Sequence, residues 1–302
     1  MNPGTSNATH GPRAVRAATH HEGLHMRFLS ILLLLSCLYG VVAAPARAET
    51  VEVCTGTIDQ LPATIDAQGT WCLDHDLSTA LSGGGAITIT TNNVTIDCNG
   101  FKVGGLAAGE ASQAIGILAV DQHNVTVRNC GVRGFHRGIA LGGSGHLVQD
   151  NRLDQNLSIG IAVFGDGHHV QDNRVFDTGG APDAATSYGI TGAGDMIGNA
   201  IDGVFATAAN ATVYGIAIFE SGSEVRGNRV RNLAPQGAGQ AYGLFAGADY
   251  VTLRGNTLSL AVETPGKGIY TTGTDTFCTD NVAIRFDVAY STCALGFNNV
   301  AL

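Results

Sequence analysis

The sequence predicts an all-β protein whose short strands stack turn upon turn into a solenoid. Three observations predict it. An apolar residue followed three positions later by Asn recurs along the chain, which we call the Asn mark, and Gly followed by Ile or Leu, the Gly mark, recurs between the Asn marks. The segments between these marks alternate apolar and polar residues without a helical period. Hydrophobic residues make up 44% of the 302 residues, which is too apolar for a disordered chain, and the 14% of charged residues are too few for long amphipathic helices.

The Asn mark recurs at short and unequal intervals along most of the chain. A unit this short cannot bury its own apolar face, so successive units must stack, with neighbouring strands about 4.8 Å apart. An inward side-chain amide at each turn can hydrogen-bond the turns beside it, and Asn also accepts the left-handed backbone of a bend. We therefore expect a buried Asn ladder. Its eight positions, one of which carries Cys, are Asn99, Cys130, Asn151, Asn173, Asn199, Asn228, Asn256 and Asn281.

The Gly mark divides each turn into two arcs of different regularity. The arc from the Gly to the next Asn mark has nearly the same length in all turns but one, whereas the length of the other arc varies widely. Insertions therefore collect on one side of the coil, where loops on a rigid scaffold can carry binding groups. These variable segments are residues 100–115, 174–188, 200–214, 229–242 and 257–267.

Residues 93–100 (NVTIDCNG) and 124–130 (NVTVRNC), with the Asp-Asn-Arg and Gly-Ile units that follow, resemble the right-handed parallel β-helix repeat family, the pectin-lyase-like superfold. The resemblance covers roughly residues 86–285. It implies a right-handed single-stranded parallel β-helix with an N-terminal cap, but that fold hosts lyases, hydrolases, epimerases and non-catalytic surface proteins. The Gly-His-Gly arrangement of polygalacturonase-like hydrolases and the Asp-Pro-His-Asp signature of alginate epimerases are both absent.

Residues 1–48 predict an N-terminal extension and a secretory signal peptide. Met26 and Arg27 precede an apolar run over residues 28–44, and Ala46-Arg47-Ala48 forms a cleavage site, so we expect cleavage after Ala48 and translation from Met26. An uncleaved anchor and a lipoprotein signal ending at Cys37 are the alternatives. The rest of the chain divides into an N-terminal cap over 49–85, a parallel β-helix over 86–285 and a C-terminal cap over 286–302.

The charge of the exported chain restricts its partners. Without residues 1–48 it holds 12 basic and 24 acidic residues, a net charge of −12. Nucleic acid is therefore excluded, and an acidic polysaccharide is disfavoured unless a cation such as Ca²⁺ mediates the contact. We expect a secreted or periplasmic monomer that has no membrane contact after signal cleavage and whose partner is a polysaccharide.

Six cysteines remain after signal cleavage, an even number that permits disulfides in an exported chain. Proximity in the sequence favours Cys54 with Cys72 and Cys278 with Cys293. Cys98 and Cys130 are expected as small core residues.

The most concentrated polar cluster comes from two adjacent turns, residues 146–152 and 168–174. Because the two segments match position by position, stacking places Asp150 over Asp172, Arg152 over Arg174, and His146 over His168. Two carboxylates on adjacent turns have the separation of a retaining glycosidase pair, or they can hold Ca²⁺ against an acidic sugar while an Arg abstracts the proton. The candidate catalytic residues are therefore Asp150, Asp172, Arg152, Arg174 and His168, with the metal unknown. Surface ion pairs between Asp and Arg are the competing structural interpretation.

A second feature is a column of Tyr188, Tyr214 and Tyr242, each immediately before its Gly mark, with Lys267 at the same position of the next turn. These four residues are candidate substrate-binding groups, because aromatic faces can stack on sugar rings. The alternative is an aromatic ladder that completes the core.

Two functions follow from these observations. The first is an exported β-helix enzyme of lyase, hydrolase or epimerase type that acts on an extracellular or cell-envelope polysaccharide. The alternative is a non-catalytic glycan-binding or structural surface protein, which the missing catalytic signatures favour.

Overall fold

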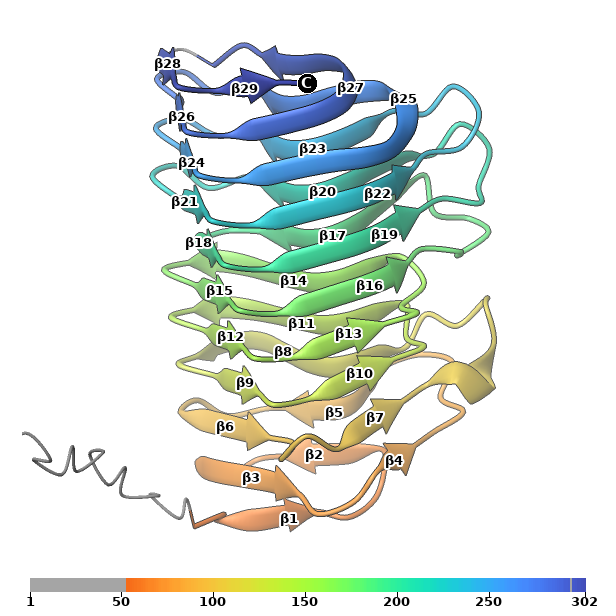
Figure 1. Cartoon of the computed structure of the whole chain (residues 1–302). Helices are drawn as coiled ribbons and strands as arrows, with labels where there is room; N and C mark the ends of the chain where they lie inside the picture. The colour runs from red at the N-terminus through yellow and green to blue at the C-terminus, as the bar shows by residue number, and fades with distance from the viewer. Residues whose placement is uncertain (1–52, 294) are drawn as a thin grey trace, which may run out of the picture. The chain divides into compact units, whose positions relative to one another are not determined.

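The computed structural model describes residues 53–302 except residue 294, and these residues form a coil of stacked strands (Figure 1). The pairings between turns are parallel and in register, so each turn lies over the one before it. The predicted all-β parallel solenoid is confirmed. In the described part of the chain the one helical element is the 3-10 turn η1 (Leu106–Ala108). No helix among those residues is long and apolar enough to cross a membrane.

The strands form three faces. The first face is an eleven-stranded sheet: β1 (Gly56–Ile58), β3 (Gly69–Leu73), β6 (Val94–Asp97), β9 (Thr126–Arg128), β12 (Leu147–Gln149), β15 (His169–Gln171), β18 (Asp195–Ile197), β21 (Glu224–Arg226), β24 (Thr252–Arg254), β26 (Phe277–Thr279) and β28 (Leu295–Phe297).

The second face follows the first along each turn and consists of β4 (Leu77–Ser78), β7 (Lys102–Gly104), β10 (Gly131–Arg133), β13 (Arg152–Asp154), β16 (Arg174–Thr178), β19 (Ala200–Phe205), β22 (Arg229–Ala234) and β29 (Val300–Ala301). The third face closes the turn with β2 (Ala63–Ile65), β5 (Gly85–Ile89), β8 (Ile115–His123), β11 (Arg137–Ser144), β14 (Ile159–Asp166), β17 (Thr186–Gly192), β20 (Thr212–Ile218) and β23 (Ala241–Ala246). Two long strands, β25 (Thr257–Thr271) and β27 (Val282–Ser291), run across the second and the third face.

The core fills the inside of the coil because the short strands alternate inward and outward residues. In β12 the central Val148 is fully buried between two half-exposed neighbours, and Val170 of β15 and Met196 of β18 repeat the pattern. Each inward residue thus lies over its counterpart in the turn below, and the stacked apolar side chains form one continuous cluster.

The predicted Asn ladder is present from Asn151 upward. Each side-chain Nδ2 donates to the Oδ1 of the next Asn, at 2.9 Å from Asn151 to Asn173 and 3.0 Å from Asn173 to Asn199. The ladder continues one turn beyond the predicted series, to Asn299. The placement of Asn99 in it was wrong: this side chain is exposed and donates to the Leu73 carbonyl oxygen.

Three disulfides join the six described cysteines. The pairs Cys54–Cys72 and Cys278–Cys293 are confirmed. Cys98 and Cys130 are buried as expected, but they are bonded to each other, because stacking brings residues 32 positions apart to a Cα separation of 4.7 Å. The Cys130 backbone N–H donates to the Asn151 Oδ1 at 3.0 Å, so this disulfide lies at the start of the ladder.

The Gly marks are sites where two turns approach closely. A Cβ built on Gly138 would lie 2.7 Å from the Gly160 carbonyl oxygen, and one on Gly160 would lie 2.5 Å from the Gly189 carbonyl oxygen. Only Gly fits this position without moving the backbone.

The loops between the second and third faces all leave the coil at one corner, visible at the right of Figure 1. They include residues 105–114, 179–185, 206–211 and 235–240. Residues 257–267 differ, because they belong to β25 and form no loop.

The segments expected to be caps carry strands that continue the coil. In the described part of the N-terminal segment, β1 pairs with β3 and β3 with β6, while β29 pairs with β27 at the other end. The boundaries at 49–85, 86–285 and 286–302 remain predictions. The signal peptide predicted for residues 1–48 lies outside the described residues.

Candidate functional site

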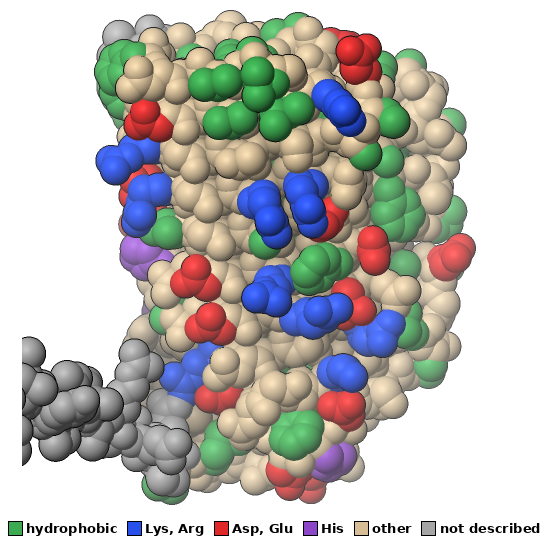
Figure 2. All heavy atoms as spheres, in the orientation of Figure 1, with side chains coloured by type: hydrophobic (Ala, Val, Ile, Leu, Met, Phe, Trp, Pro, Cys, Tyr) green, Lys and Arg blue, Asp and Glu red, His purple; other side chains and the backbone are tan. Residues whose placement is uncertain are grey.

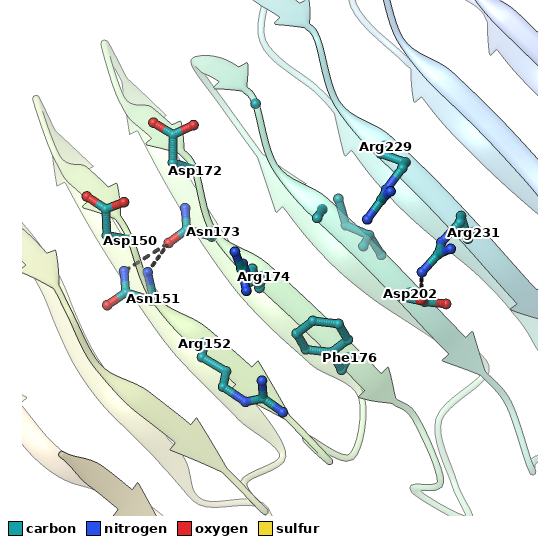
Figure 3. Close-up of a pocket in the computed structure, with 13 residues that line it drawn as sticks. Asp150, Asn151, Arg152, Asp172, Asn173, Arg174, Phe176, Asp202, Arg229 and Arg231 are labelled. Carbon is teal, nitrogen blue, oxygen red and sulfur yellow. Dashed lines mark hydrogen bonds and ion pairs between the residues drawn. The ribbon is translucent and has the colours of Figure 1, made fainter. Parts of the chain in front are cut away.

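A groove of about 740 Å³ lies over the second face, at the turns of β13, β16, β19 and β22. Four of the five predicted catalytic residues line it: Asp150, Arg152, Asp172 and Arg174. Figure 2 shows Lys and Arg side chains gathered over this part of the second face, and Figure 3 shows the groove residues. We call this site the arginine groove.

The two carboxylates are placed by the bend between the first and second faces. Asp150 and Asp172 both have φ 55°, a left-handed conformation that Asp tolerates. Asn151 and Asn173 then turn inward to the ladder, and the next residues, Arg152 and Arg174, turn outward and pair in register across β13 and β16. The predicted stacking of the two Asp-Asn-Arg units is therefore present.

The carboxylates do not neutralise the arginines beside them. In the part of the chain that the structure describes, no ion pair joins Asp150 to Arg152 or Asp172 to Arg174. Figure 3 shows both carboxylates extending to one side and both guanidinium groups to the other. Arg152 lies instead over the ring of Phe176, with its Cζ 5.0 Å from the ring centroid. A lattice of Asp–Arg pairs along each strand thus does not explain these residues.

The groove has two columns of outward residues: an inner column with Arg152 and Arg174, and an outer column two residues farther along each strand, with Phe176, Asp202 and Arg231. The charges of the outer column neutralise one another. The Asp202 carboxylate binds the Arg231 guanidinium and also accepts a hydrogen bond from the Asn232 Nδ2 at 2.7 Å. Farther down the same column, the Arg133 Nη2 lies 3.5 Å from the Asp154 Oδ2. The charge that remains available to a ligand is therefore on the inner column of arginines.

His168 lies elsewhere. It is buried at the corner between the third and first faces, with its ring stacked on that of His146 at a centroid distance of 4.8 Å. Its Nδ1 accepts the His146 backbone N–H at 3.2 Å. Burial lowers the pKa of His168, and burial lowers the pKa of His146 to about 4. The structure does not bring this predicted catalytic residue to the arginine groove.

The tyrosine column is on the outside of the third face. Tyr188, Tyr214 and Tyr242 share one register, and Lys267 takes the same position in the next turn. Neighbouring rings are stacked at 4.8 and 5.0 Å, so most ring faces contact one another and present edges and hydroxyls to solvent. Burial and the neighbouring tyrosines raise the pKa of Tyr214 to about 12. Lys267 Nζ lies 3.5 Å from the ring centroid of Tyr270. The ends of the column are also covered, because Tyr270 stacks on Tyr242 at a centroid distance of 5.6 Å and Tyr188 packs against the cluster that contains Ile159. The column therefore offers a sugar its ring edges and hydroxyls.

Arg229 lines the same groove but was not among the predicted site residues. A signal for it was present: Arg follows the ladder Asn in three turns, at Arg152, Arg174 and Arg229. Phe176, Asp202 and Arg231 were also missed, because they lie two residues farther along their strands, and their convergence depends on the stacking of unequal turns.

Within residues 53–293 and 295–302, no grouping of three or more His, Cys, Asp or Glu side chains has an arrangement able to hold a metal ion.

The coil, its Asn ladder and its loops at one corner define the class of repeat proteins built from stacked parallel strands. A family model described as "Right handed beta helix region" matches residues 110–287, more than half of the chain. The chain belongs to this right-handed β-helix family.

A solved structure, described as the crystal structure of Dettilon tailspike protein (gp208), is similar to this chain at 14% sequence identity with a TM-score of 0.35. The alignment covers 81% of this chain and 60% of the tailspike chain, so the present chain spans less than two thirds of that protein. No curated protein matches the chain.

Proposed function

We propose that this β-helix protein is exported and binds a polysaccharide that lies across successive turns in the arginine groove. The observation that carries the proposal is the alignment of polar groups from consecutive turns along one groove, with Arg152 and Arg174 in direct register. A polymer of repeating units fits a surface that itself repeats at about 4.8 Å. Guanidinium and carboxylate groups together can bind the hydroxyl and acidic groups of a glycan.

Export is supported by two independent features. The sequence of residues 1–48 has the parts of a cleavable secretory signal. The three disulfides are bonds that persist in an oxidising compartment, such as the periplasm or the medium. N-terminal sequencing of the exported protein is expected to start at Glu49, and a chain that retains residues 28–44 would contradict the assignment.

Catalysis is the second candidate, and Asp150 and Asp172 are the observation that favours it. Both occupy the same bend position in adjacent turns and both line the groove. In a retaining glycosidase one such carboxylate attacks the anomeric carbon while the other donates a proton to the leaving oxygen. The same pair can instead hold Ca²⁺ for a lyase in which Arg152 or Arg174 removes the proton.

The tyrosine column is proposed as a second contact surface for the same polymer. The hydroxyls of Tyr188, Tyr214 and Tyr242 can form hydrogen bonds along a glycan, and Lys267 adds a positive charge at the end of the row.

A screen of the purified mature chain against pectin, alginate, xylan and glycosaminoglycans, with and without Ca²⁺, tests these functions. Retention on one glycan without cleavage is expected from a binding protein, whereas new reducing or unsaturated ends identify an enzyme. If no glycan is retained or cleaved, the proposal is wrong.

A further inference from the structure

In one turn of the arginine groove, the turn of β19, the inner positions carry small residues. The inner column runs in register from Arg152 through Arg174 and Ala200 to Arg229. At the bend before it, Gly198 takes the place that Asp150 and Asp172 hold in the two turns below. Gly198 and Ala200 thus leave a gap one turn deep, which we call the notch.

The notch at Gly198 is shaped around the carboxylate of the turn below. A Cβ at position 198 would lie 2.6 Å from the Asp172 Oδ1, so a larger side chain there would displace this carboxylate. The left-handed φ of 66° also favours Gly. The Asp172 carboxylate therefore occupies the space that a side chain at position 198 would fill, and it lies at the edge of the notch beside Ala200.

Two cations border the notch. Arg174 lies below it and Arg229 above it, and Figure 3 shows both side chains beside the groove. Among the described residues, neither guanidinium forms a hydrogen bond or an ion pair. Asp202 cannot neutralise them fully, because Arg231 and Asn232 already occupy its carboxylate oxygens. The two arginines are separated by two strand spacings, about 9.6 Å, and their long side chains can reach a common ligand.

We propose that the notch is the subsite for one acidic sugar residue, whose oxyanion is bound by Arg174 and Arg229. This inference rests on the proposed glycan function and names its ligand chemistry. Guanidinium groups bind carboxylate and sulfate oxygens through parallel N–H bonds. Asp172, at the edge of the notch, accepts a hydrogen bond from a sugar hydroxyl and repels the anion toward the arginines. Because the arginines supply the positive charge, the acidic group binds without a bridging cation, although the chain without residues 1–48 has a net charge of −12.

The first experiment compares three oligosaccharides of equal length in EDTA: a uronate oligomer, its carboxyl-reduced neutral counterpart, and a sulfated neutral oligomer. The acidic oligomers are expected to bind at least tenfold more tightly than the neutral one, with an affinity that falls as salt is added. A preference for the uronate or for the sulfate identifies the source of the anion. Equal affinity for acidic and neutral oligomers overturns the acidic subsite but keeps the glycan function. Binding of none of them overturns both.

The second experiment removes the charges singly. Arg174→Gln and Arg229→Gln are each expected to weaken binding of the acidic oligomer about tenfold, with little effect on the neutral one. Arg254→Gln is the matched control, because Arg254 is an exposed arginine of the first face outside the groove. Ala200→Leu fills the notch and is expected to weaken binding of the acidic oligomer without any change of charge. If Arg254→Gln weakens binding as much as the groove variants, the attraction is general and the subsite is wrong.

Discussion

The bend residues Asp150 and Asp172 combine a structural and a chemical role. Their left-handed backbone explains why Asp is accepted there, since Asn129 and Gly198 hold the same conformation at the equivalent bends. The structural role requires a residue that tolerates positive φ, whereas the chemical role requires a carboxylate. Asn and Ala substitutions therefore separate the two.

Asp150→Asn and Asp172→Asn are each expected to abolish any glycan turnover while the stability is kept, because Asn tolerates the backbone but cannot act as nucleophile or proton donor. The Ala variants are expected to lose turnover and also about 1 kcal/mol of stability, because Ala disfavours positive φ. Turnover rates and urea unfolding measure both effects. Full turnover in both Asn variants would show that the site of cleavage lies elsewhere.

The stacked histidines His146 and His168 should make stability depend on pH. Burial lowers their folded-state pKa below the ordinary 6.5, to about 4 for His146, so the unfolded chain binds more protons between these values. The contribution of these two histidines to stability is therefore fully present above pH 6.5 and is lost as the pH falls toward 4. The charged groups near the pair are His123, Asp166 and His169.

The melting temperature is accordingly expected to fall between pH 6.5 and 4 in the native chain, and to fall less in His146→Asn, which keeps an acceptor for the Val125 N–H. His75→Asn, an exposed histidine that does not contact the stacked pair, serves as control and should retain the native slope. An unchanged slope in His146→Asn would contradict the assignment.

At the scale of single elements, the Asn ladder holds the bend between the first and second faces. The sequence repeat predicted it because the Asn spacing follows the turns, and Asn99 was misplaced because the early turns have the Cys98–Cys130 disulfide at that position. Each internal ladder residue accepts two hydrogen bonds from the turn before and donates two of its own. Removal of one member thus leaves several buried groups without partners.

Asn199→Ala is expected to lower the free energy of unfolding by about 3 kcal/mol, since the Asn173 backbone N–H and side-chain Nδ2 lose their acceptor in the core. Asn299→Ala, at the partly exposed end of the ladder, is the control and is expected to cost about 1 kcal/mol. Chemical unfolding followed by circular dichroism measures the difference. Similar small losses in both variants would show that the ladder contributes little.

At the scale of the whole described coil, each turn contacts its neighbours, so local stability should vary along the axis. Cys54–Cys72 joins the first strands and Cys278–Cys293 the last turns, whereas the turns of β12 to β24 contain no disulfide among the described residues. The central turns are held by the Asn ladder and the apolar core. These two disulfides therefore lie at the ends of the described coil, where the outermost turns have a neighbour on one side only, whereas Cys98–Cys130 joins the turns of β6 and β9, which have neighbours on both sides.

Reduction is expected to increase hydrogen exchange in the turns of β1 to β9 and β26 to β28, while the turns of β15 to β22 keep their protection. Exchange measured by mass spectrometry with and without reductant tests this. A uniform increase over all turns would mean that the coil unfolds as one unit.

The sequence by itself determined the stacked coil, the register of Asp150 with Asp172 and of Tyr188 with Tyr214, and the corner that carries the insertions, because these depend on periodicity alone. The tertiary structure decided which side chains meet. Cys98 pairs with Cys130, His168 is buried away from the groove, and the tyrosine rings stack on one another. Arg174 and Arg229 lie on either side of the turn that carries Gly198 and Ala200. A repeat specifies the height of a residue in the stack, but the direction of its side chain and the partner that it finds depend on the bends and on neighbours from turns of unequal length.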